Sequence, residues 1–385
     1  MNLLFFQTGD YAEAYDRFSE GGAETYRDQR ASVMFVADLA RTHQVTTVSR
    51  TAPERDRELA PGLRSVAIGR QPLNRTEAAK LLDRLAPDAL VLRTPDLAVL
   101  QAACARGIAI LPCFADLFTP GGVRDRWYNW QLSRLLKNAG IPCVANHSLN
   151  ASRAVIDVLG YGAARTVPWD WTRLENVAPS RNGLRDPATP SIFYAGALSA
   201  DKGVGDCLEA LQLLHHRDRS VEMTFAGPGD LDGWRTKARD LGLEGHVKFL
   251  GQIPHAAVRT AMAEHDMVIV PSRHSYPEGL PNVIYEGLAA RSPLLVSDHP
   301  AFAGRLTDGT HCLQFRAGDP DALAGAVGRL CDDPALFRRL SEQAAAGLEG
   351  LYVGLEWATL IELFLRDPND STGWVGANSM ATLQG

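Results

Sequence analysis

Short apolar runs alternate with longer amphipathic stretches along the first 170 residues of the chain. The apolar runs are bounded by polar or turn residues and lack regular polar alternation, which is typical of strands buried on both faces. We predict strands at residues 3–6, 45–48, 89–92, 108–111 and 143–145, and helices at residues 24–42, 74–85 and 124–138. Strands that alternate with helices indicate βαβ units and a parallel sheet.

The alternation breaks between Pro168 and Pro190 and then restarts. This interval holds four prolines, one glycine and few aliphatic side chains, a composition typical of a linker between domains. Beyond it we predict strands at residues 191–194, 222–226, 246–250, 267–270 and 294–297, and helices at residues 204–214, 232–241, 256–264, 283–290, 320–330 and 334–348. The predicted fold class is therefore α/β, with two doubly wound, Rossmann-like domains at residues 1–170 and 171–355.

The end of the chain carries one more amphipathic stretch and then a polar tail. Residues 356–366 predict a final helix, which we expect to return to the first domain. The tail at residues 367–385 is rich in Gly, Ser, Asn and Thr, and we expect it to be disordered.

The composition excludes several classes of protein. Hydrophobic residues make up 45% of the 385 residues, and 39 basic against 45 acidic residues give a net charge of −6. These values exclude intrinsic disorder, and a mildly acidic chain lacks the electrostatics of a general nucleic-acid binder, so we expect no nucleic-acid partner. The six cysteines form no C-x-x-C pair, which favours free thiols in a reducing compartment.

The N-terminus lacks a basic region before its short apolar run, and no stretch approaches the ~18 apolar residues of a spanning helix. We therefore expect a cytoplasmic protein. Peripheral contact with the inner face of a membrane stays open, because residues 124–137 mix basic residues with Trp127, Tyr128 and Trp130. This stretch could touch an anionic lipid surface or a sugar acceptor. The alternative, which we favour, is a core-facing helix whose basic side chains reach out to solvent.

The most informative stretch runs from residue 271 to residue 290. It follows a predicted strand and opens a predicted helix, with Pro281 suited to the first helical position. The turn exposes the backbone amides of Gly279, Leu280 and Asn282 at a helix N-terminus, which predicts an anion site.

Two carboxylates frame that anion site. Glu278 lies just before the predicted helix, and Glu286 lies more than one turn inside it. Carboxylates are natural acceptors for paired sugar hydroxyls, so this layout suits a ligand with hydroxyls on both sides of a diphosphate, as in a nucleotide sugar. The alternative is that Glu278 only caps the helix dipole and Glu286 is a solvated helix residue. Because strand, turn and helix are in register, we favour the functional interpretation.

Two glycine-containing loops follow the first predicted strand of each domain. The loop at residues 196–203 places Lys202 where its ammonium can reach a phosphate as a point charge, although most lysines in turns are surface residues. Gly21 and Gly22, which we place between the first strand and the first helix, allow the backbone to approach a ligand closely. A plain loop with a helix cap explains the two glycines equally well.

Two later loops of the second domain end strands at the same predicted rim. Gly227 follows one strand, and Gln252 and Ile253 follow the next. Backbone groups of these loops could contact a nucleotide base, although each loop alone is an ordinary α/β connection.

Taken together, these stretches resemble the retaining GT-B glycosyltransferases of the family-4 type, the glycosyl transferases of group 1. The most specific element is the stretch from Glu278 to Glu286, which is similar to the family's Glu-x7-Glu motif. The resemblance implies that Glu278 contacts the donor sugar, that Glu286 contacts the ribose, and that Lys202 contacts the diphosphate. It also implies that the loop of Gly21 and Gly22 approaches the donor.

The resemblance further implies two domains that face each other across a cleft and a metal-independent hexosyltransferase of polysaccharide biosynthesis. The donor would be a nucleotide-diphosphate sugar, used as a co-substrate without any cofactor. The acceptor would be a glycan, a lipid-linked sugar or another glycoconjugate. On this basis Glu278, Lys202 and Asp116 are the candidate catalytic residues. The candidate donor-binding residues are Gly21, Gly22, Lys202, Gly227, Gln252, Ile253, Glu278, Gly279, Leu280, Asn282 and Glu286.

The chain departs from the family pattern in two places. Ala197 stands where the family usually has an arginine that helps to hold the diphosphate, so we expect Arg273 or Arg291 to substitute. Ala115 stands where the family often has a histidine, just before Asp116. Retaining transfer still works if the leaving phosphate takes the acceptor proton. These departures keep two alternatives open, a nucleotide-sugar epimerase of the same fold and a degenerate, non-catalytic binder of nucleotides or glycans.

Overall fold

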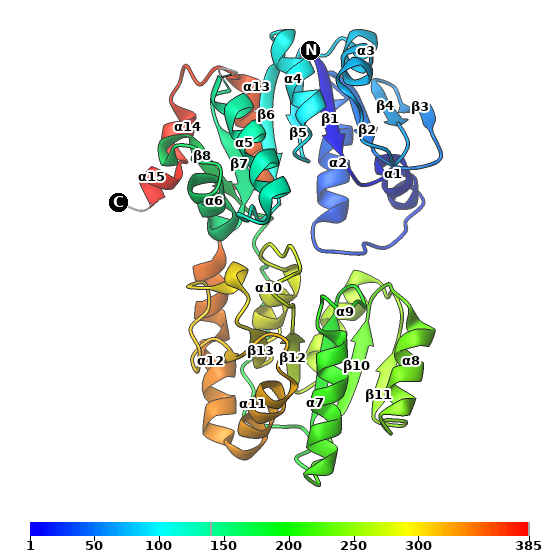
Figure 1. Ribbon diagram of the computed structural model, residues 1–385, viewed down its shortest axis with the longest axis vertical. Coiled ribbons are helices and arrows are strands. Elements are labelled where there is room, and N and C mark those ends of the chain that lie inside the picture. Colours follow the sequence, from blue (N-terminus) through cyan, green and yellow to red (C-terminus); the bar gives the residue numbers. More distant parts are fainter. Residues whose placement is uncertain (139–140, 384–385) are drawn as a thin grey trace. The chain divides into compact units, whose positions relative to one another are not determined.

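The computed structural model describes residues 1–138 and 141–383 and divides the chain into two compact units (Figure 1). The first unit comprises Met1–Gly22, Asp28–Thr172 and the stretch from Val353 onward, and the second comprises Ala23–Arg27 and Arg173–Tyr352. Each unit is built on one parallel sheet with helices on both faces, so the predicted fold class is confirmed.

The sheet of the first unit has eight strands in the order β3-β4-β2-β1-β5-β6-β7-β8. Neighbouring strands pair in parallel, except that the edge strand β3 runs antiparallel to β4. Apolar runs form the central strands because both of their faces are buried, and Leu3 and Phe6 are at most 2% exposed. The strands are β1 (Asn2–Gln7), β2 (Gln44–Ser49), β3 (Arg55–Ala60), β4 (Leu63–Ala67), β5 (Ala89–Leu92), β6 (Ala109–Phe114), β7 (Val144–His147) and β8 (Thr166–Trp169).

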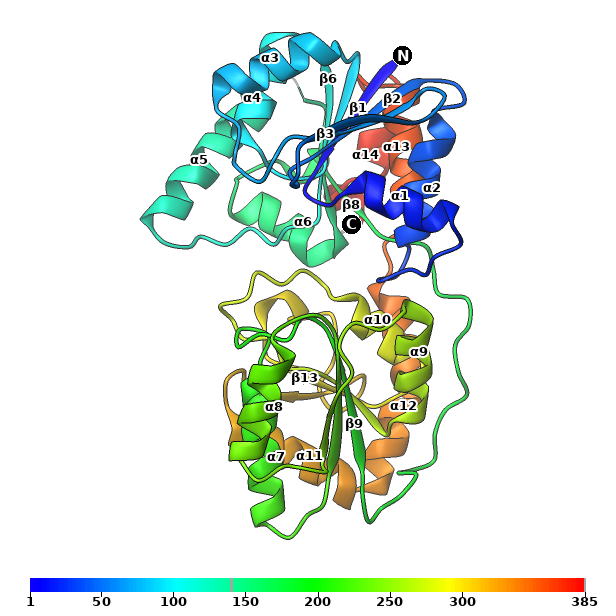
Figure 2. The same ribbon diagram turned by 90° about the vertical axis from the view of Figure 1, so that its right-hand side faces the viewer.

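Helices cover both faces of this sheet (Figure 2). One apolar core lies beneath α1, α2, α13 and α14, and the other lies beneath α3, α4, α5 and α6. The helices are α1 (Tyr11–Ser19), α2 (Gln29–Leu39), α3 (Arg75–Leu85), α4 (Leu97–Ala105), α5 (Val123–Asn138), α6 (Ser148–Asp157), α13 (Trp357–Arg366), α14 (Trp374–Ala377) and α15 (Met380–Leu383), with a 3-10 turn at Ala163–Arg165.

The second unit has a six-stranded sheet in the order β11-β10-β9-β12-β13-β14, and all of its strand pairs are parallel. Its strands are β9 (Ser191–Ala195), β10 (Glu222–Ala226), β11 (Val247–Phe249), β12 (Met267–Val270), β13 (Leu294–Ser297) and β14 (Leu313–Phe315). Its helices are α7 (Val204–His216), α8 (Leu231–Asp240), α9 (His255–Glu264), α10 (Asn282–Ala289), α11 (Pro320–Asp332) and α12 (Pro334–Leu351), with a 3-10 turn at Pro300–Phe302.

The predicted helix at residues 24–42 is wrong at its start, because a separate helix, α1, precedes α2. Gly21 and Gly22 terminate α1, and their N–H groups donate to carbonyl oxygens of its last turn at 3.2 and 2.7 Å. Gly21 has a φ of +79°, which a residue without a side chain adopts readily. This pair of hydrogen bonds is the Schellman motif of helix ends. The two glycines therefore follow the first helix, whereas we expected them to precede it.

The connection between the units starts later than the predicted linker. Pro168 lies within β8, and the first unit extends to Thr172. Beyond it, residues 173–190 run along the second unit, where the Arg181 guanidinium donates to three backbone carbonyls of α9 and the end of α10 at 2.9, 3.1 and 3.2 Å. The short segment Ala23–Arg27 also belongs to the second unit, although the chain on both sides of it belongs to the first.

The expectation of a disordered tail is wrong for residues 367–383, and residues 384–385 lie outside the described residues. This tail forms α14 and α15, which bury Trp374 and Met380 to 5% and 1% exposure. The indole Nε1–H of Trp374 donates to the carbonyl oxygen of Asp367 at 3.0 Å. The polar composition concealed a few large apolar side chains whose burial orders the tail.

Helix α5 faces the core on one side, as we favoured, but its other side exposes large apolar side chains. Its Leu132 and Leu136 are buried, but Val123, Trp127 and Trp130 are 87%, 60% and 50% exposed. The two indole rings stack on each other with centroids 4.9 Å apart. No described helix of the chain combines the length and the apolar character needed to cross a membrane.

The order of the tail can be tested by Trp374→Ala. Removing a buried tryptophan from the core should lower the free energy of unfolding by about 3 kcal/mol. Urea denaturation followed by circular dichroism measures the loss, and Trp127→Ala is the matched control because that side chain is exposed. Equal midpoints for Trp374→Ala and the unsubstituted protein would show that the tail does not contribute to the fold.

Candidate functional site

The site residues of the second unit gather at the carboxyl ends of its parallel strands. β9 lies between β10 and β12, so the connections on its two sides diverge, and open α/β sheets bind ligands at such a switch point. The loops after β9, β10, β11 and β12, together with the first turns of α10, carry the candidates predicted for this unit: Lys202, Gly227, Gln252, Ile253, Glu278, Gly279, Leu280, Asn282 and Glu286.

Glu278 is a buried carboxylate with two partners. It is 6% exposed, and its Oε2 accepts hydrogen bonds from the Lys202 Nζ at 2.5 Å and the Ser272 Oγ at 2.6 Å. The Lys202 ammonium also lies 4.3 Å from the ring centroid of Tyr276. Pro281 is the N-cap of α10 and no side chain of the described residues caps the helix, so Glu278 makes no capping hydrogen bond and is bonded to Lys202 and Ser272 instead.

Glu286 lies in the second turn of α10 and is only 4% exposed, so the alternative of a solvated helix residue is also wrong. The Nε2 of His255 hydrogen-bonds to its Oε1, and the Nδ1 of His255 lies 3.6 Å from the Oε2 of Glu24. These two carboxylates, Glu24 first and then Glu286, raise the pKa of His255 to about 9. At neutral pH the imidazolium therefore bridges Glu24 and Glu286.

A cavity of about 190 Å³ lies against the side chain of Glu286. Five of the predicted site residues line it, namely Gly227, Gln252, Ile253, Asn282 and Glu286. The segment Thr25–Arg27, the turn Ala195–Ala197 and His255 also form part of the wall. Lys202 and Glu278 are not among the residues that line the cavity, so they form a second cluster at the start of α10.

Close packing of the site loops requires glycine at two positions. A Cβ on Gly227, whose φ is +145°, would lie 1.8 Å from the carbonyl oxygen of Gly196. A Cβ on Gly203 would lie 2.2 Å from the carbonyl oxygen of Pro271. Any side chain at these positions would push apart the loops after β9, β10 and β12.

The start of α10 presents backbone donors. Pro281 is the N-cap and not the first helical residue that we expected, and the helix begins at Asn282, one residue before the predicted range 283–290. The N–H groups of Gly279, Leu280 and Asn282 donate to no acceptor within the described residues 1–138 and 141–383. Such donors at a helix N-terminus attract anions. The predicted anion site therefore has its donors available, next to Lys202.

Residues 189–333, which hold most of these site residues but not the segment with Glu24 and Arg27, match the family model described as glycosyl transferases group 1. An alpha-D-kanosaminyltransferase of Streptomyces kanamyceticus is 33% identical over 168 residues, which is 43% of this chain and 42% of that protein. A phosphatidyl-myo-inositol mannosyltransferase of Mycolicibacterium smegmatis is 37% identical over 157 residues, 40% of each chain. This part of the chain is therefore similar to the group 1 glycosyltransferases. The matched stretches span less than half the length of these curated relatives.

Solved structures share the fold of the whole chain. Anabaena HepE in complex with UDP has a TM-score of 0.67 at 16% identity and covers 96% of this chain and 100% of its own. A sucrose-phosphate synthase from Thermosynechococcus elongatus has a TM-score of 0.66 at 16% identity and covers 95% and 98%. The fold is therefore that of the GT-B glycosyltransferases.

The arginines expected to replace the family's diphosphate contact at Ala197 do not line the cavity. Arg291 is wrong for this role, because its Nη1 donates to two backbone carbonyls of α12 at 3.1 and 2.8 Å. Arg273 is paired with the buried carboxylate of Asp206 at 2.9 and 2.5 Å. The cavity wall instead carries Arg27, which is 2% exposed, and the imidazolium of His255.

Arg27, Glu24 and His255 were not found from the sequence. The Arg27 guanidinium lies 4.7 Å from the ring centroid of Tyr285, within the second unit. Glu24 and Arg27 are far from the other site residues in sequence, and only the fold brings them together. His255 had one usable indication, its place at the start of a helix after the predicted loop of Gln252.

The remaining candidates of the group 1 pattern lie in the first unit. Gly21 and Gly22 end α1, as described above. Asp116 follows β6 next to Ala115, and burial of its surroundings raises the pKa of its carboxyl, although the side chain keeps contact with solvent. The side-chain amide of Asn146 donates to the Asp116 carbonyl oxygen at 2.9 Å.

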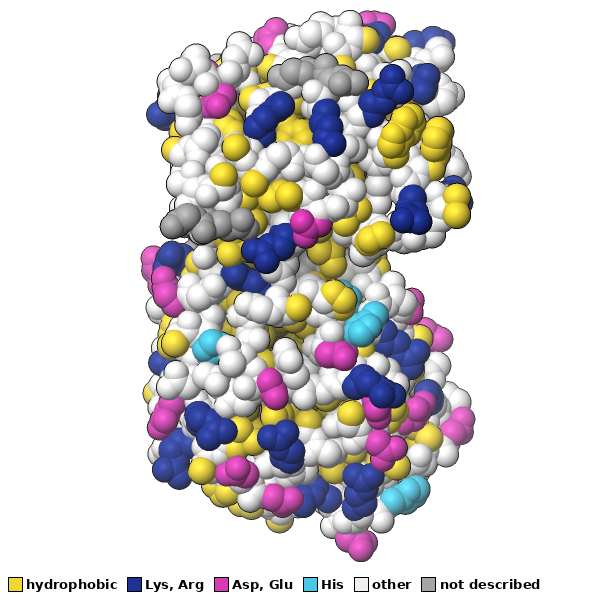
Figure 3. Space-filling model, turned by 60° about the vertical axis from the view of Figure 1, so that its left-hand side comes forward, with side chains coloured by type: hydrophobic (Ala, Val, Ile, Leu, Met, Phe, Trp, Pro, Cys, Tyr) yellow, Lys and Arg dark blue, Asp and Glu magenta, His cyan; other side chains and the backbone are white. Residues whose placement is uncertain are grey.

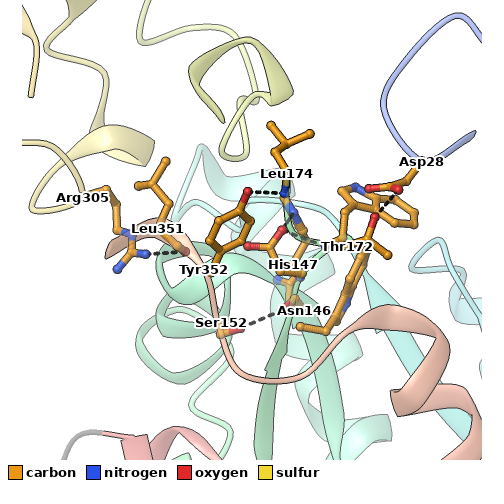
Figure 4. Close-up of polar contacts among 12 residues, drawn as sticks. Asp28, Asn146, His147, Ser152, Thr172, Leu174, Arg305, Leu351 and Tyr352 are labelled. Atoms are coloured by element: carbon orange, nitrogen blue, oxygen red, sulfur yellow. Dashed lines mark hydrogen bonds and ion pairs between the residues drawn. The ribbon is translucent and has the colours of Figure 1, made fainter. Parts of the chain in front are cut away.

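The carboxyl end of β7 is a buried polar cluster near Asp116 (Figure 4). The hydroxyl of Ser152 donates to the carbonyl oxygen of Asn146 at 3.0 Å, and the Nε2 of His147 lies 3.3 Å from the Oδ1 of Asp170. Among the described residues, no group of three or more His, Cys, Asp and Glu side chains is placed to hold a metal ion.

The bridge at His255 can be tested by NMR titration of its imidazole. Its pKa should lie at about 9, and Glu286→Gln should lower it, whereas Glu264→Gln, on the same helix but outside the bridge, should leave it unchanged.

The bridge at His255 should also make the stability of the fold depend on pH. Because folding raises the pKa of His255, the stabilisation of the folded state is complete below pH 6.5 and is lost as the pH rises through about 9. Urea denaturation of His255→Gln should therefore show a deficit at pH 6 that disappears near pH 10. A measured pKa at or below 6.5 would contradict the bridge.

Proposed function

We propose that this chain is a retaining glycosyltransferase that moves a hexosyl group from a nucleotide-diphosphate sugar to a glycan, a lipid-linked sugar or another glycoconjugate. The observation that carries the proposal is the start of α10. Unbonded backbone amides lie there between two buried carboxylates, Glu278 and Glu286, and each carboxylate has its own cationic partner. This arrangement provides separate acceptors for two sets of hydroxyls and donors for the diphosphate between them.

The nucleotide half of the donor is assigned to the cavity of the second unit. Glu286 would accept hydrogen bonds from the ribose hydroxyls, and the backbone of Gly227, Gln252 and Ile253 would contact the base. Support comes from the cavity itself, because all four residues line it. HepE, which shares the fold, has been solved in complex with UDP.

The diphosphate is assigned to Lys202 and to the amides of Gly279, Leu280 and Asn282. An ammonium has three protons, so Lys202 can keep its bond to Glu278 while it donates to a phosphate oxygen. Glu278 would in turn hold the hydroxyls of the donor sugar.

In the transfer step, an acceptor hydroxyl attacks the anomeric carbon on the face that the diphosphate leaves. The bond from the anomeric carbon to the phosphate oxygen breaks, the new glycosidic bond forms, and the acceptor proton passes to the departing phosphate. Lys202 and the amides stabilise the negative charge that develops there, which gives transfer without a metal ion. Asp116 is assigned to the acceptor side, where burial of its surroundings raises the pKa of its carboxyl.

The protein is proposed to act in the cytoplasm, in polysaccharide or glycoconjugate synthesis, with peripheral contact to the inner membrane face. Support for membrane contact comes from α5, on which Val123 and Trp127 are exposed beside arginines.

The catalytic assignment can be tested by Lys202→Ala. Loss of a preorganised cation at the leaving group should slow transfer by about 10²–10³. The measurement is release of nucleoside diphosphate from nucleotide hexoses with and without added acceptors, and Lys248→Ala is the control because that lysine is exposed and pairs only with Glu222 among the described residues. Near-normal turnover of Lys202→Ala would remove Lys202 from the mechanism.

The binding assignment can be tested by Glu286→Gln. A charge-assisted hydrogen bond is worth about 1.5–3 kcal/mol, so the affinity for UDP or GDP should fall by roughly tenfold or more. Isothermal titration gives the constants, and the exposed Glu264→Gln is the control. Unchanged affinities would contradict the ribose contact. Tight nucleotide binding without transfer to any acceptor would instead favour the non-catalytic binder.

A further inference from the structure

The first unit contains a cavity of about 840 Å³ that the proposed donor site does not use. It lies beside the starts of α3 and α4, and residues of α5 form part of its wall. A volume of this size is typical of sites for small-molecule ligands. Its floor includes Leu97 and Leu135, and polar side chains lie around them.

The charged groups that line this cavity are mostly cationic. Three arginines line it, Arg50, Arg75 and Arg134, and among the described residues the one carboxylate that lines it is Asp96. Asp96 is already engaged, because its Oδ1 accepts from two N–H groups of the first turn of α4 at 3.0 Å and its Oδ2 lies 3.6 Å from Arg50. Arg75 and Arg134 form no ion pair with any described residue. The face of the first unit in Figure 3 likewise shows more basic than acidic side chains.

Two of these arginines are prepared to bind an anion. The Arg134 guanidinium lies 5.6 Å from the ring centroid of Trp130, which holds it at the cavity wall. The Nε–H of Arg50 is buried and finds no acceptor in the part of the chain that the structure describes. A buried donor without a partner costs free energy, and an anionic ligand would supply the missing acceptor.

The remaining polar groups suit hydroxyls. The side chains of Gln101 and Gln131 line the cavity, and an amide both donates and accepts hydrogen bonds. The Tyr128 hydroxyl, by contrast, already donates to the Pro95 carbonyl oxygen at 2.6 Å. We propose that this cavity binds an anionic saccharide, with its carboxylate or phosphate on the arginines and its hydroxyls on the amides. If the proposed glycosyltransferase function holds, this saccharide is an acidic sugar unit of the acceptor; this assignment rests on the proposed function.

The test is a titration of the full chain, without nucleotide, with glucuronic acid, glucose 6-phosphate and glucose, followed by ligand-observed NMR. At least one of the two charged sugars should bind, and which one does so separates a carboxylate from a phosphate. Glucose should bind at least about tenfold more weakly. Arg134→Gln should weaken binding of the charged sugar by roughly tenfold. Arg126→Gln is the matched control, because Arg126 lies on the same helix but does not line the cavity.

Three results would overturn the proposal: equal binding of glucose, equal loss in Arg126→Gln and Arg134→Gln, or binding to phosphatidylglycerol vesicles but to none of the sugars. The last would make α5 and its surroundings a lipid surface. UDP affinity is measured in parallel on the same variants. If the unsubstituted protein does not bind UDP, the proposed donor site is wrong. The sugar titration, in contrast, tests only this cavity.

Discussion

Burial of a carboxylate is costly unless a cation or several hydrogen-bond donors accompany it, and the second unit buries two of them around one helix start. Glu278 is neutralised by Lys202 from the loop after β9, and Glu286 is neutralised by His255 from the loop after β11. Each pair therefore requires loops from different strands to meet. The geometry of the proposed donor site depends on these two pairings.

The sheet topology and two glycines of the second unit allow these loops to meet. Parallel strands bring all of the loops to one edge, and glycines at Gly203 and Gly227 let the loop backbones approach to distances that no side chain would permit. The cationic bridge at His255 then reaches out to Glu24, which fixes the segment Ala23–Arg27 to the second unit. A ribose bound at Glu286, as proposed above, would share that carboxylate with His255.

Local patterns in the sequence were sufficient for the fold class and for the stretch from Glu278 to Glu286, because strand, turn and helix there are contiguous. The partners of those carboxylates were not predictable, since His255 meets Glu286 only through tertiary packing. The edge strand β3 was missed because its sequence, RDRELA, is charged and largely exposed and so lacks an apolar run. The ordered tail was missed because a few buried side chains, including Trp374, outweigh a polar average composition.

The central claim is that one nucleotide diphosphate spans the two carboxylate clusters of the second unit. A crystal structure of the chain with UDP or GDP tests it most directly. The account predicts the ribose on Glu286, in place of or beside His255, and the diphosphate on Lys202 and the amides of Gly279 and Leu280. A nucleotide seated elsewhere, with the bond between Lys202 and Glu278 and the bridge at His255 both undisturbed, would contradict it.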